Sequence, residues 1–189
     1  MGGVPYLLCH PHADEKYRRV KALGIDPGLV VTGYGLLEQE DGHIRLVEAG
    51  TIDSGKAQDP LPLRLRKLYQ ELDELIGDYH PDVMALEQLY SHYEHPRTAI
   101  LMGHARGVIC LAAGVHNIPL HHYAATEVKS ALTGNGRASK DQIQQLVRRT
   151  FGLLETPRPP DVADAVAIAL CHLYRQGTRS AEDYLRLMK

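Results

Sequence analysis

Residues 20–37 read VKALGIDPGLVVTGYGLL, and this stretch begins the fold. The apolar residues before Asp26 predict a buried strand. Asp26-Pro27-Gly28 is typical of a turn, because proline fixes φ and glycine permits a positive φ. A second strand is predicted from Val30 to Leu37, and Asp41-Gly42 then marks a hairpin into a third strand, Ile44 to Ile52. Three strands joined by tight turns are expected to be antiparallel neighbours.

After residue 60 the pattern changes to alternating helices and strands. Leucines three and four residues apart predict a helix over 61–76, and Ser139 with Gln142 has the spacing of a capping box. The other expected elements are a strand over 83–87, a helix over 97–115, a strand over 118–123, a short helix over 126–132 and a last helix over 161–176. This order predicts an α/β fold. Its mixed five-stranded sheet has three antiparallel strands plus two parallel ones, and helices on both faces.

The composition is that of a globular protein. The chain has 189 residues, of which 44% are hydrophobic and 23% charged, which excludes disorder or a coiled coil throughout. We expect one domain over 21–177, a flexible extension over 1–20 and a tail over 178–189. No apolar run approaches the roughly 20 residues of a membrane span. Three widely separated cysteines suggest neither a zinc site nor a disulfide framework, so a cytoplasmic location is expected.

Charge is distributed unevenly along the chain. The net charge is −2, yet residues 97–149 hold seven basic residues against two acidic ones. Such a stretch fits a surface that binds a polyanion, and a solvated helical face explains it about equally well.

Four acidic residues stand at the ends of predicted core elements: Asp26, Glu87, Asp161 and Asp164. A carboxylate at the end of an apolar strand is costly unless something pairs with it. Asp161 and Asp164 share one face of a helix. Oxygen ligands alone select hard cations such as magnesium or manganese. Each acid also has an ordinary explanation, as a helix cap, a turn residue or a salt-bridge partner.

Several motifs, in this order, resemble the RuvC family of Holliday-junction resolvases. They are residues 23–28 (LGIDPG) with 32–35 (TGYG), 85–87 (ALE), 103–107 (GHARG), 128–129 (VK), 133–140 (TGNGRASK) and 160–165 (PDVADA). The resemblance implies an RNase H-like fold, a homodimer and magnesium-dependent cleavage of four-way DNA junctions in recombination and repair. It also implies two Mg²⁺ ions per subunit, with Mn²⁺ as a substitute, and a RuvA-RuvB branch-migration complex as partner.

The family's functional residues map onto this chain by position. The resemblance makes the four acids catalytic and metal-binding, and it gives Lys129 and Lys140 active-site and DNA-binding roles. Tyr90 stands where the family usually has a phenylalanine near the junction centre. The segment 91–96 lacks the family's usual asparagine, and residues 1–20 match no family motif.

Further DNA contacts and other functions are considered from the residues. Arg137 lies in a glycine-rich turn beside Lys140, and Arg106 lies in the same basic stretch, so both are candidate DNA contacts. Residues 99–113 are almost entirely apolar, which predicts a helix covered by a partner subunit or by its own domain. The alternative functions are a nuclease for structured RNA, an actin-like kinase lobe and an inactive junction-binding module.

Overall fold

The computed structural model describes residues 19–88 and 96–176. Within them the elements follow the predicted order: β1 Val20–Asp26, β2 Val31–Glu40, β3 His43–Asp53, α1 Leu61–Tyr79, β4 Val83–Glu87, α2 Pro96–Val115, β5 Leu120–Tyr123, α3 Ala125–Thr133, α4 Lys140–Thr150 and α5 Pro160–Gln176. β5 starts two residues later than expected. The reason is that the N–H of Ile118 closes the end of α2 by donating to the Ala113 carbonyl.

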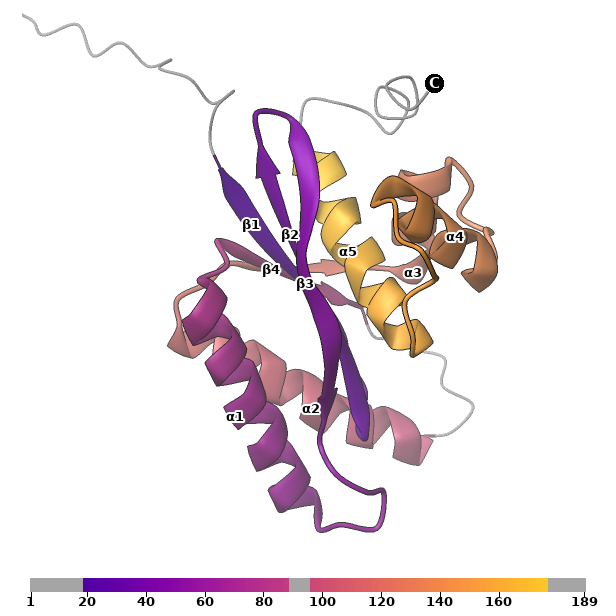
Figure 1. Ribbon diagram of the computed structural model, residues 1–189. Helices are drawn as coiled ribbons and strands as arrows, with labels where there is room; N and C mark the ends of the chain where they lie inside the picture. Colours follow the sequence, from indigo (N-terminus) through magenta and orange to yellow (C-terminus); the bar gives the residue numbers. More distant parts are fainter. Residues whose placement is uncertain (1–18, 89–95, 177–189) are drawn as a thin grey trace, which may run out of the picture.

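The five strands form one mixed sheet in the order β3-β2-β1-β4-β5 (Figure 1). β1, β2 and β3 are antiparallel neighbours, whereas β4 pairs in parallel with both β1 and β5. The predicted sheet is therefore confirmed. In the register, Asp26 lies opposite Gly33, and Ile25 lies opposite Leu86. The ends of β1 and β4 consequently meet at one edge of the sheet.

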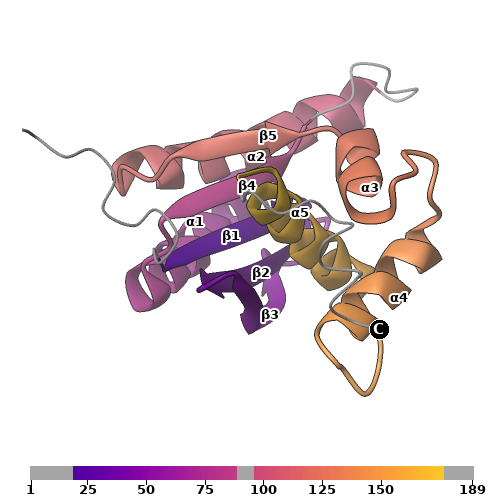
Figure 2. The ribbon, with the colours of Figure 1, turned by 90° about the horizontal axis from the view of Figure 1, so that it is seen from above.

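Helices cover both faces of the sheet (Figure 2). The face under α1 and α2 holds the side chains of Leu23 and Ile25, together with buried residues of both helices. The opposite face, which includes Ala22, packs against α5, and α3 and α4 extend this second core. Successive residues of β1 thus alternate between the two faces, as expected for a strand buried on both sides.

α5 lies unusually close to β1 and β2, because glycines face it. A Cβ on Gly24 would stand 2.2 Å from the Ala165 carbonyl oxygen, and a Cβ on Gly33 would stand 2.1 Å from that of Asp161. Only glycine permits this approach. The glycines therefore place the first turns of α5 directly over the end of β1.

Candidate active site

Two of the four acids come from neighbouring strand ends. Side chains along a strand alternate, so Asp26 lies on the same sheet face as Ala22, and Glu87 on the same face as Val83 and Ala85. This is the face covered by α5. The two carboxyl groups stand at the adjacent ends of β1 and β4 and line the same cavity.

The first turns of α5 bring the other two acids to the same place. Asp164 lines a cavity of about 160 Å³ together with Asp26, Glu87, Lys129 and Lys140. The Lys140 ammonium lies 3.3 Å from Asp164 Oδ2. Asp161 is not part of that lining, but its negative charge raises the pKa of Asp26. The structure therefore gathers three of the acids and both predicted lysines around one cavity, with Asp161 near enough for its charge to act on Asp26.

This arrangement changes how Asp26 and Glu87 titrate. Burial, followed by the charges of Glu87, Asp164 and Asp161, raises the pKa of Asp26 to about 8, and Lys140 opposes the rise. Burial and the charge of Asp164 also raise the pKa of Glu87. Carboxylates that share a desolvated site repel one another when they are ionised. Additional positive charge among them would therefore stabilise their ionised forms.

The donor set fits a hard divalent cation. Within residues 19–88 and 96–176, no three His, Cys, Asp or Glu side chains already stand close enough together to hold a metal ion. The converging groups are nevertheless all carboxylates, the ligands that Mg²⁺ and Mn²⁺ prefer. A cation among them would offset the repulsion that raises the pKa of Asp26.

The other candidate DNA contacts differ in their surroundings. Arg137 is exposed on the turn between α3 and α4, where its backbone N–H donates to the Asn135 side chain. Tyr90 lies outside the described residues. Arg106 is almost buried, with 9% of its surface exposed, and it donates to the backbone carbonyl of Glu87 and lies 3.1 Å from Nδ1 of His122. The apolar pattern of residues 97–115 predicts a helix, but it does not predict that Arg106 contacts Glu87 and His122.

The chain matches the family model described as crossover junction endodeoxyribonuclease RuvC over residues 22–172. It belongs to the RuvC family. The matched region includes all four acids as well as Lys129 and Lys140. The expected family membership is thus confirmed, and the five-stranded mixed sheet agrees with the RNase H-like fold that the resemblance implied.

Individual relatives from the RuvC family cover most of the chain. A crossover junction endodeoxyribonuclease RuvC from Rhodopirellula baltica is 55% identical over 80% of this chain and 85% of its own length. Among solved structures, T. thermophilus RuvC in complex with Holliday junction substrate superposes with a TM-score of 0.78. It is 31% identical, and the match covers 83% of this chain and 94% of that one.

Proposed function

We propose that this chain is an endonuclease that resolves four-way DNA junctions in recombination and repair. The observation that carries the proposal is the convergence of three carboxylates and two lysines at one cavity, with Asp161 close by, in a member of the RuvC family. The solved complex of the T. thermophilus relative with a Holliday junction supports junction DNA as the substrate. Nothing favours structured RNA.

The four acids would hold two Mg²⁺ ions per subunit, with Mn²⁺ as a substitute. Such ions, when bound, activate water and stabilise the leaving oxygen of a phosphodiester. The chain itself positions the reactants: Asp26 and Glu87 are fixed on strand ends, and Lys140 pairs with Asp164. Paired symmetric nicks would leave 5′-phosphate and 3′-hydroxyl ends.

The basic side chains would hold the DNA backbone near the acids. Lys129 and Lys140 line the cavity, so their ammonium groups can reach phosphates on either side of the scissile bond. Arg137 would extend this contact along the glycine-rich turn. For Tyr90, stacking on a base at the branch point stays a prediction.

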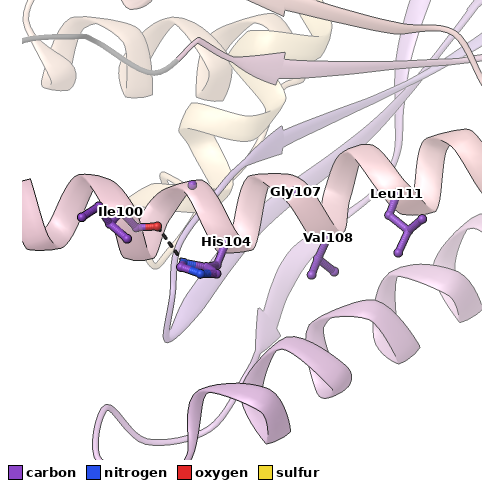
Figure 3. Close-up of a pocket in the computed structure, with 6 residues that line it drawn as sticks. Ile100, His104, Gly107, Val108 and Leu111 are labelled. Carbon is purple, nitrogen blue, oxygen red and sulfur yellow. Dashed lines mark hydrogen bonds between the residues drawn. The ribbon is translucent and has the colours of Figure 1, made fainter.

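α2 offers a surface for a second copy of the chain. Ile100, His104, Gly107 and Leu111 lie on one side of the helix and line an open hollow of about 450 Å³ (Figure 3). By length and composition Thr98–Val115 could also cross a membrane, as many core helices could. The side of α2 that faces away from this hollow, with Ala105 and Ile109, belongs to the core. We propose that the apolar side forms a homodimer.

The remaining partners follow from the proposed substrate. A junction has two-fold symmetry, which a dimer with paired sites matches. A RuvA-RuvB branch-migration complex would deliver the junction, and work on chromosomal DNA would take place in the cytoplasm.

Cleavage of defined substrates by wild type and Asp161→Asn tests the proposal. We expect the wild type to cut a mobile four-way junction with Mg²⁺ and to leave matched duplex and structured RNA intact. Asp161→Asn keeps the size of the side chain but loses its charge, so it should fold, bind the junction and cleave at least about 100-fold more slowly. Near-normal cleavage by this variant would make Asp161 a helix cap only. Preferential cleavage of structured RNA would overturn the proposed substrate.

A further inference from the structure

Arg106 connects α2 to the end of β4 from the sheet face opposite α5. Its Nη1 donates to the backbone carbonyl of Glu87, and its Nη2 lies within hydrogen-bonding distance of His122. α2 packs with α1 on the other side of the sheet from the acidic cluster. The guanidinium therefore reaches Glu87 from behind, through the backbone rather than through the carboxylate.

The peptide group that follows Glu87 is held at both of its polar atoms. Its carbonyl accepts from Arg106, and its N–H, that of Gln88, donates to the carbonyl of Tyr123 on β5. A peptide unit is planar, so two bonds on opposite sides fix its orientation. Glu87 is the last residue of β4, where the ladder of backbone hydrogen bonds ends. This pair of contacts therefore holds the backbone at Glu87, whose side chain lines the acidic cavity with Asp26.

His122 in turn holds the guanidinium. It lies beside Leu86 in the register of β4 and β5, one residue before the level of Glu87. A guanidinium has only N–H donors, so Nδ1 of His122 must be the acceptor. Partial desolvation of the ring by its neighbours, followed by the positive charge of Arg106, lowers the pKa of His122, which favours the neutral ring that this bond requires.

The surroundings of Arg106 do not suit a contact with DNA. Its side chain is almost buried and is absent from the lining of the acidic cavity, whereas Lys129 and Lys140 both belong to that lining. A residue that pairs with phosphates has to present its charge to solvent before DNA arrives. Arg106 presents its charge to Glu87 and His122 instead.

We infer that Arg106 is a positioning residue that orients Glu87 through its backbone, with His122 holding the guanidinium in place. The inference rests on the proposed function, because Glu87 matters only if the cluster binds a cation. It assigns Arg106 a different role from the DNA contact expected from its basic neighbours.

Two independent readouts separate positioning from DNA contact. The first readout is the salt dependence of junction binding without divalent cations, which reports phosphate contacts. The second is the affinity for Mn²⁺, measured by calorimetry, together with the rate of single-turnover cleavage, and both report the acidic cluster. Arg106→Gln should keep the salt slope of wild type, while Mn²⁺ affinity and cleavage fall about 10- to 100-fold, as for other residues that orient a ligand. Arg106→Lys should recover part of the loss, because one ammonium can still donate to the Glu87 carbonyl.

Matched variants provide the controls. Lys129→Ala should make the salt slope shallower by about one unit, as expected for one lost phosphate contact. Arg66→Gln, which removes an exposed arginine on α1, should match wild type in every readout. His122 is exposed, so His122→Ala should fold even if Arg106→Gln does not, and it should weaken Mn²⁺ binding several-fold at an unchanged slope.

Each outcome decides the matter. A slope reduced by about one unit in Arg106→Gln would make Arg106 a phosphate contact and overturn the inference. Unchanged Mn²⁺ affinity and cleavage in Arg106→Gln, or in His122→Ala where the arginine variant is unfolded, would also overturn it. A wild type that neither binds Mn²⁺ nor cuts junctions would overturn the proposed function itself.

Discussion

Asp26 keeps its proton to about pH 8 in the folded chain, whereas its ordinary pKa is 3.8. Burial is the largest cause, and the neighbouring acids add to it. Between these two pH values the folded state therefore binds more protons than the unfolded state. The free energy of unfolding should fall as the pH rises through this window, when no cation is bound. Asp26 thus lowers the stability of the cation-free protein at neutral pH, because its carboxyl group is buried among other acids at the proposed cation site.

Asp26→Asn should remove most of this pH dependence. The variant is neutral at every pH, so in a chelating buffer it should unfold with wild-type stability at pH 3.8 or below, where Asp26 is largely protonated in the unfolded chain as well. Near pH 8 we expect it to be more stable than wild type by about 1–2 kcal/mol, the usual scale for relieving a strained functional site. Thermal unfolding at both pH values, with cleavage as the second measurement, checks this. Equal pH dependence in both proteins would show that Asp26 is already ionised in the folded chain.

At the scale of elements, the position of α5 decides whether the acids meet. Gly33→Ala would place a methyl group against the Asp161 carbonyl, so the start of α5 must move away from β2. We expect a loss of about 1–3 kcal/mol in stability, as in other overpacked cores, together with strongly reduced cleavage.

Gly77→Ala is the matched control for that substitution. Gly77 lies in α1, and a Cβ there would meet nothing within 4 Å. The free energy of unfolding of this variant should rise by about 0.5–1 kcal/mol, because alanine has a higher helix propensity than glycine, and the variant should cut junctions normally. If Gly33→Ala also cleaves normally, α5 does not need the close approach in order to position Asp161 and Asp164.

Sequence patterns predicted the elements well because their signals are local. The run Val83–Glu87 is a strand with the predicted bounds, and Ser139 and Gln142 form the predicted capping box. The sequence also placed Asp26 and Glu87 at the ends of two predicted strands, and the parallel pairing of β1 with β4 brings these ends together. The contact between Arg106 and Glu87 depends on how α2 crosses the sheet, and no local pattern reports a crossing angle.

At the scale of the whole molecule, one helix serves both the core and the proposed dimer. α2 buries Ala105, Ile109 and Ala112, while Leu111 and Ile100 stay more than half exposed on its other side. Such exposed residues in a row on a buried helix indicate a partner surface rather than scattered surface leucines. Because Arg106 lies on this same helix, the proposed dimer surface and the contact with the Glu87 carbonyl belong to one element.

Leu111→Glu should therefore separate binding from paired cutting. A charge in the apolar hollow opposes association of two copies, so sedimentation at micromolar concentration should show a monomer where wild type is a dimer. The monomer would hold one acidic cluster, and it should nick one strand of a junction without the matching nick opposite. Leu154→Glu changes a leucine that is 92% exposed on the loop between α4 and α5, and it should leave mass and paired nicks unchanged. A monomeric wild type, or paired nicks by monomeric Leu111→Glu, would contradict the dimer, since two cuts placed symmetrically require two sites held together.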